Sequence, residues 1–112
     1  MKQVIVVNGA LELPVGKLAV QVAHAAIAGL LAVDGPGRLA WLQAGMPKVV
    51  LRGDDAEMLE RLEGEARAAG IPTDLVRDAG RTVVPAGTVT CVVLGPAPSA
   101  DVDRLTRSLP LL

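Results

Sequence analysis

Two kinds of apolar run alternate along the chain. Four short runs, most of them rich in Val, predict β-strands, because β-branched side chains favour extended backbone. The predicted strands are residues 2–7, 48–52, 73–78 and 88–95. Longer runs rich in Ala and Leu, or with apolar positions three and four residues apart, predict α-helices. The predicted helices are residues 16–32, 38–45, 54–69 and about 100–108.

Capping and turn residues mark the ends of the predicted helices. The segment DGPG at 34–37 ends the first helix, because Gly and Pro interrupt helical backbone. Asp54, with Glu57 three residues later, forms a capping pair that we expect to open the third helix. We expect Gly70 to end that helix and Ser99 to cap the fourth.

The lengths of the connections predict the topology. Helices separate the first strand from the second and the second from the third, as parallel strands require. Only residues 79–87 join the third strand to the fourth, which is too short for a parallel crossover of about a dozen residues. The fourth strand should therefore run antiparallel. We expect an α/β fold, a three-layer α/β/α sandwich on a small mixed four-stranded sheet, with residues 1–112 forming a single domain.

Composition narrows the class of protein. Hydrophobic residues make up 51% of the 112 residues, which excludes a disordered chain. Trp41 is the only aromatic residue, so the stacking platforms of a typical single-strand nucleic-acid reader are missing. The net charge is −1, but six of the twelve acidic residues fall within 54–65. A mildly basic surface elsewhere therefore remains compatible with the sequence.

Cysteine usage and the N-terminal pattern predict the compartment. Cys91 is the only cysteine, which excludes a disulfide framework and a cysteine-based zinc site. We interpret it as a buried, inert thiol in a reducing compartment. The N-terminus enters a predicted strand directly, and polar residues interrupt the longest apolar run. We expect a cytoplasmic protein without a membrane segment, a metal site or a cofactor.

The first predicted helix carries three polar residues among apolar ones. Gln21 and His24 follow Lys17 by four and seven residues, which places the three within about 60° of one another around the helix. A single polar stripe is typical of a solvent-facing side. It is also what a chemical face would look like, since Lys, Gln and His are flanked here by Ala rather than by further charges. Periodicity alone leaves both interpretations open.

A second polar cluster follows the third predicted strand. The segments DAGRT at 78–82 and GTVT at 87–90 should meet at one edge of the sheet, where ligands of α/β proteins bind. Thr88 and Thr90 should point to the same side, because side chains alternate along a strand. The alternative is an ordinary turn, in which Asp78 bonds its own backbone and Gly80 has positive φ.

The two clusters are predicted to lie close together. Lys17 follows the first strand, so its helical turn starts near the edge where Asp78 lies. Lys17, His24, Asp78 and the threonines would then face one cleft, with groups suited to hydrolytic acid–base chemistry. Neither a G-x-S-x-G nucleophile elbow nor a complete P-loop occurs in the sequence.

With these residues placed, the chain resembles the type II peptidyl-tRNA hydrolases over nearly its whole length. The matching segments are KQVIVV, GKLAVQVAHA, KVVL, AGIPTDLVRDAGRT, GTVTCVVLGPAP and LPLL. The resemblance implies cleavage of the ester between a peptide and the 3′ end of tRNA, with peptidyl-tRNA as partner and no cofactor. By the same resemblance, four residues are catalytic: Lys17, His24, Asp78 and Thr90. Five others would line the substrate site: Gln21, Gly80, Arg81, Thr82 and Thr88.

These side chains suggest a mechanism. Asp78, together with His24, would position and deprotonate a water, while Lys17 and a threonine hydroxyl would stabilise the developing oxyanion. The sequence departs from the family pattern at Asn8 and Ala10, where Arg and Asp are usual, and at Val83, where Gln is common. Two alternatives therefore stay open: a binding module without hydrolase activity, and a hydrolase of a small acylated substrate. The apolar end LPLL is compatible with a homodimer.

Overall fold

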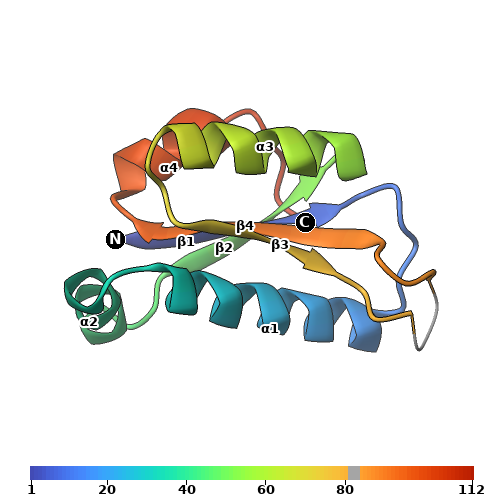
Figure 1. Cartoon of the computed structure of the whole chain (residues 1–112), viewed down its shortest axis with the longest axis horizontal. Helices are drawn as coiled ribbons and strands as arrows, with labels where there is room; N and C mark the ends of the chain where they lie inside the picture. The colour runs from blue at the N-terminus through green and yellow to red at the C-terminus, as the bar shows by residue number, and fades with distance from the viewer. Residues whose placement is uncertain (81–83) are drawn as a thin grey trace.

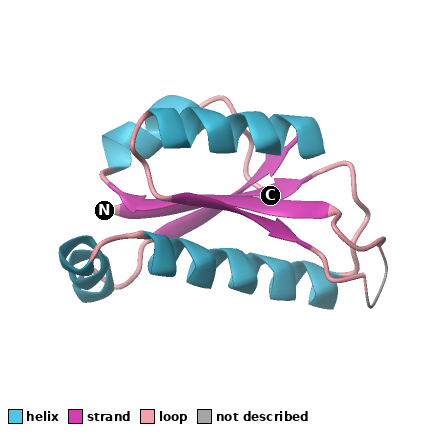
Figure 2. Cartoon of the chain, in the orientation of Figure 1, coloured by secondary structure: helices cyan, strands magenta, loops and turns pink. Residues whose placement is uncertain are grey.

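A central sheet lies between two layers of helices in the computed structural model, which describes residues 1–80 and 84–112 (Figure 1). The strands are β1 (Lys2–Asn8), β2 (Lys48–Gly53), β3 (Thr73–Arg77) and β4 (Val89–Ala97). The helices are α1 (Val15–Ala32), α2 (Gly35–Gln43), α3 (Ala56–Ala68) and α4 (Ser99–Thr106). Helices α1 and α2 cover one side of the sheet, and α3 and α4 cover the other (Figure 2). This arrangement confirms the predicted α/β fold and the order of its elements.

The sheet is mixed, with strand order β2-β1-β4-β3. Strands β1 and β2 pair in parallel, whereas β4 is antiparallel to both β1 and β3. The antiparallel last strand was predicted from its short connection and is confirmed. Because β1, β2 and β3 all run in one direction, their carboxyl ends share an edge with the beginning of β4. That edge carries the polar segments singled out in the sequence.

The central strands are buried on both faces. All residues of β4, and all of β1 after Lys2, are buried. Side chains alternate between the two faces of a strand, so β1 contributes Val4 and Val6 to the core under α3 and α4, and Ile5 and Val7 to the core under α1. The β-branched composition of these strands therefore fills two thin aliphatic cores.

Helix α1 packs on the sheet through small residues. Its buried residues are Gln21, Ala25 and Gly29, each four positions from the next. A Cβ on Gly29 would lie 2.4 Å from the carbonyl oxygen of Gly95, so any larger residue would push the helix away from β4. The small residues allow close approach and leave several large apolar side chains of α1 on the outside.

Among the described residues, α1 is the helix that has the length and apolar composition of a membrane-crossing segment. That is weak evidence by itself, because the core helix of a soluble protein passes the same test. In the structure α1 lies along the sheet and contacts β1, β3 and β4.

Three predicted helix ends were wrong by a few residues. Asp55, not Asp54, caps α3, because its side chain accepts from the Met58 N–H at 2.9 Å. Helix α2 begins at Gly35 rather than at 38, since the Asp34 carboxylate caps it by accepting from Gly37 N–H at 2.7 Å. Helix α4 begins at Ser99, which therefore makes no cap.

Candidate active site

A buried ion pair between Asp78 and Lys17 occupies the edge of the sheet. Asp78 directly follows β3, and Lys17 lies in the first turn of α1. The ammonium Nζ of Lys17 contacts Asp78 Oδ1, and only 2% of the Asp78 side chain is exposed. The predicted meeting of these two residues is therefore present in the structure. A carboxylate withdrawn from water in this way needs a partner, and Lys17 supplies it.

Backbone hydrogen bonds fix the position of Asp78. Its N–H donates to Thr88 O at 2.9 Å, and its carbonyl accepts from Gly87 N–H at 2.8 Å. Its second carboxylate oxygen, Oδ2, accepts from the Gly80 N–H at 2.6 Å. Gly80 has φ +78°, a left-handed conformation that glycine adopts without strain. The turn interpretation and the functional one thus describe the same geometry: the turn holds the carboxylate in place.

The neighbours of Asp78 keep it ionised. The hydrogen bond from Lys17 lowers the pKa of the Asp78 carboxyl below its usual value, and the Gly80 N–H and the positive charge of Lys17 act in the same direction. Burial opposes them by raising the pKa, but the net shift is downward. Asp78 is therefore a carboxylate near neutral pH, an acceptor of hydrogen bonds.

Gln21 and Thr90 form a buried polar contact beside this ion pair. Gln21 is only 3% exposed, and Thr90 is fully buried on β4. The Thr90 hydroxyl donates to Gln21 Oε1 at 2.7 Å, a normal length for O–H···O, and lies 3.2 Å from Val76 O. Within residues 1–80 and 84–112, the Gln21 Nε2 group forms no hydrogen bond. The contact to Oε1 therefore leaves two N–H donors available in the site.

A cavity of about 270 Å³ brings these groups together. Its lining comprises Lys17, Val20, Gln21, His24, Arg77, Asp78 and Ala79. The predicted stripe of Lys17, Gln21 and His24 therefore faces a single cavity, although its members differ in exposure. Gln21 lies at the buried side of α1, and His24 is exposed at the open side. The stripe is thus neither a plain solvent face nor a set of core residues.

The structure does not bring Thr88 into this cavity. Thr88 is outside the cavity lining, because its hydroxyl donates to Pro85 O at 2.7 Å within the turn before β4. Arg81, Thr82 and Val83 fall outside the described residues. Arg77 lines the cavity and was not predicted, although its place directly before Asp78 at the strand end is a signal that the sequence contains.

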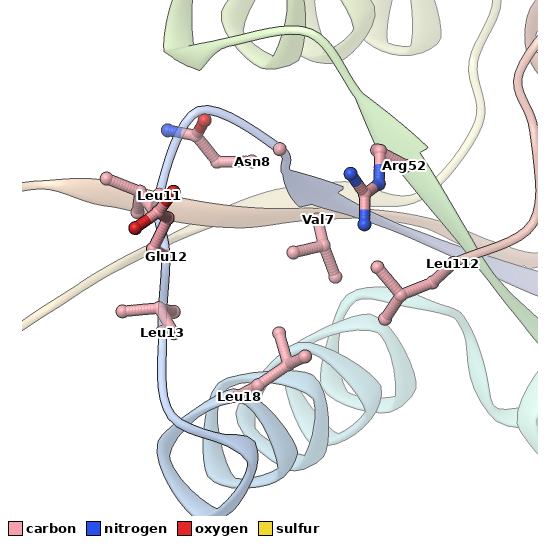
Figure 3. A pocket seen from close by; sticks show the side chains of 9 residues that line it. Val7, Asn8, Leu11, Glu12, Leu13, Leu18, Arg52 and Leu112 are labelled. Carbon is pink, nitrogen blue, oxygen red and sulfur yellow. The ribbon is translucent and has the colours of Figure 1, made fainter.

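Asn8 stabilises the same edge of the sheet. Its side chain donates to Val89 O at 2.9 Å and accepts from Ala10 N–H at 3.0 Å, so it ties the end of β1 to the start of β4. Asn8 also borders a second cavity, of about 300 Å³, which shares no lining residue with the first. Figure 3 shows Val7 and Leu18 pointing toward each other across this space, with Arg52 on one side.

The described residues offer no metal site. Within residues 1–80 and 84–112, no group of three His, Cys, Asp or Glu side chains is arranged to hold an ion. Cys91 is buried on β4, and burial raises the pKa of its thiol to about 11. The polar groups that line the cavity are thus a carboxylate, an ammonium, an imidazole, a carboxamide and the guanidinium of Arg77.

Comparison with known proteins gives one consistent result. A family model described as peptidyl-tRNA hydrolase PTH2 matches residues 1–112. A peptidyl-tRNA hydrolase of Methanopyrus kandleri is 49% identical over 113 residues, covering 99% of this chain and 97% of the relative. One from Halobacterium salinarum is 46% identical, with 99% of both chains covered. One from Thermococcus onnurineus is 45% identical, covering 99% of this chain and 97% of the relative.

Proposed function

Because this chain belongs to the peptidyl-tRNA hydrolase PTH2 family and is a hydrolase of the peptidyl-tRNA ester bond, we propose that Lys17, Gln21, His24 and Asp78 carry out the hydrolysis in the cavity beside α1. The resemblance found in the sequence is thereby confirmed. The single observation that carries the proposal is the Lys17–Asp78 ion pair at the cavity. A buried ion pair contributes little net stability, whereas ionised groups held in a cleft are typical of active sites.

Asp78 positions the attacking water in this mechanism. Its lowered pKa keeps it ionised, and each carboxylate oxygen has a lone pair left beside its contact to Lys17 or Gly80. As the water oxygen bonds to the ester carbonyl carbon, one water proton moves to the carboxylate. Lys17 keeps the carboxylate oriented toward the water.

Gln21 stabilises the negative charge that develops on the carbonyl oxygen. Its Nε2 group has two donors and no partner among residues 1–80 and 84–112, and the Thr90 hydroxyl holds the amide by its oxygen. A donor fixed before the reaction costs no reorganisation when the charge appears. Thr90 is buried behind Gln21 and acts as a positioning residue, whereas the Lys17 ammonium adds a positive charge nearby.

His24 completes the proton balance. When the bond between the carbonyl carbon and the ribose oxygen breaks, that oxygen must take up a proton. His24 lines the cavity and is exposed, and an imidazole there supplies the proton. The proton held by Asp78 then passes through solvent to His24, so both side chains are restored and one water is added in total. Gly80 holds Asp78, whereas Arg81, Thr82 and Thr88 stay predictions from the resemblance.

The test measures peptide release from N-acetyl-aminoacyl-tRNA by single variants. Asp78→Asn keeps the shape and the acceptor for Gly80 but removes the charge, and Lys17→Ala removes its partner. We expect kcat to fall about a hundredfold or more in each. Arg61→Ala, which removes an exposed charge on α3, is the control and should stay within about twofold of wild type. Wild-type rates in either cavity variant would contradict the assignment.

The remaining expectations are proposals of the same kind. We propose that residues 1–112 form one domain and act in the cytoplasm, which the match of the family model to the whole range and its connection with translation support. We also propose a homodimer, which the exposed Leu111 and Leu112 support and light scattering tests. Family membership favours hydrolysis over the binding module and the small acylated substrate considered from the sequence.

A further inference from the structure

The outer side of α1 is apolar where solvent-facing helices are normally charged. After Lys17, α1 contains no Asp, Glu, Lys or Arg. Beyond Lys17, the large exposed apolar residues of α1 are Val20, Ile27 and Leu31, which are 48%, 58% and 68% exposed. Contiguous exposed apolar side chains mark a binding surface, whereas single scattered ones need no explanation. We call these three residues the α1 stripe.

The α1 stripe is continuous with the catalytic cavity. Val20 is part of the cavity lining, together with His24 one turn further along. Ile27 and Leu31 follow at seven and eleven residues from Val20, so all four side chains lie within about 60° around the helix. From Val20 to Leu31 the helix rises about 16 Å. An extended peptide of about five residues spans this length.

We propose that the α1 stripe binds the peptide part of peptidyl-tRNA while its ester lies in the cavity, an inference that rests on the proposed function. The scissile carbonyl belongs to the last residue of the peptide, so the peptide must leave the cavity along some surface. The stripe begins at the cavity wall and offers aliphatic contact, which is non-directional and tolerates many peptide sequences. The tRNA end is a poor occupant, because phosphates require basic residues that the stripe lacks.

The test compares two substrates on the same tRNA. One carries a single N-acetylated amino acid, which reaches only the cavity, and the other carries an apolar peptide of about six residues. The variant Ile27→Ser/Leu31→Ser removes the outer part of the stripe and leaves Val20 and the cavity intact. Val15→Ser is the matched control, since Val15 is also exposed on α1 but lies about 140° around the helix from Val20.

We expect the double variant to lower kcat/KM for the long substrate about tenfold, mainly through KM, because two partly buried aliphatic contacts are lost. Its kcat/KM for the short substrate, and both values for Val15→Ser, should stay within about twofold of wild type. An unchanged rate on the long substrate, or an equal loss on both, would overturn the inference. Failure of the wild type to cleave the short substrate would instead count against the proposed function.

A second copy of the chain is the competing occupant of the stripe. Light scattering at the assay concentration separates the two cases. A wild-type dimer that the double variant converts to monomers would show that the stripe is an interface between copies and would overturn the proposal. An unchanged molecular mass in the double variant, together with the selective loss on the long substrate, supports peptide binding.

Discussion

Replacing Thr90 by Val tests whether the Gln21 carboxamide must be held in one orientation. Val has nearly the shape of Thr, so the change removes the hydroxyl and little else. Thr90 is fully buried, and its hydroxyl is the donor to Gln21 Oε1 at 2.7 Å. In the variant that buried oxygen has lost its donor, which should lower the free energy of unfolding by about 1–3 kcal/mol.

The effect on catalysis should exceed the effect on folding. Without the Thr90 donor, the Gln21 amide rotates between two orientations, and Nε2 faces the cavity in only part of the molecules. Losing an oxyanion donor outright costs about 10²–10³ in kcat, so Gln21→Ala should approach that limit. The kcat of Thr90→Val should fall about ten- to a hundredfold with little change in KM. Thr90→Ser keeps the hydroxyl and should retain most of the wild-type kcat.

Thr73→Val is the matched control for a buried hydroxyl. Thr73 is also buried, and its hydroxyl donates to Val93 O at 2.8 Å at the other end of the same strand pair. Its variant should lose similar stability and keep wild-type kcat. Initial rates on N-acetyl-aminoacyl-tRNA and urea unfolding measure the two quantities. Equal kcat values for Thr90→Val and Thr73→Val would refute the positioning role.

Two further predictions concern the turn and the charge of the site. Gly80→Ala should lower both the free energy of unfolding and kcat, because φ is +78° and a Cβ would lie 2.7 Å from the Ala86 backbone. Gly64→Ala in α3 is the control: its Cβ meets nothing within 4 Å, so urea unfolding should show a gain of up to about 1 kcal/mol. The stability difference between wild type and Asp78→Asn should be constant from pH 7 to 5 and shrink only below about pH 4. Asp78 has a lowered pKa in the folded state, so its contribution is present above the unfolded value of about 3.9 and is lost as the pH falls through the folded value. A loss between pH 7 and 5 would contradict this assignment.

The parts of the fold set by chain length and periodicity could be predicted from the sequence. The short 79–87 connection fixed the direction of β4, and that direction brings Asp78, the start of β4 and the first turn of α1 to one edge. Helical spacing likewise placed Lys17, Gln21 and His24 on one side of α1. Helical spacing could not predict how deeply each of these residues is buried, because burial depends on which side of α1 packs against the sheet.

How deeply a side chain is buried decides between roles that the sequence left open for the two threonines. Thr90 and Thr88 looked equivalent as hydroxyls two residues apart on one strand. The register shift between Val76 and Arg77 leaves Thr88 in the turn, where its hydroxyl bonds Pro85 O, while Thr90 lies under Gln21. Residue type is an equally poor guide to the burial of Ile27, which is apolar like a core residue but is 58% exposed.

One packing constraint accounts for both the buried amide and the exposed stripe. Gly29 sits so close to Gly95 that it sets how α1 is rotated against β4. With Gly29 facing the sheet, Gln21, eight residues earlier, faces it too and meets Thr90. The same rotation turns Val20, Ile27 and Leu31 away from the sheet. A helix composed almost entirely of apolar residues must then leave some of them in water, and here they lie beside the cavity where a peptide substrate would emerge.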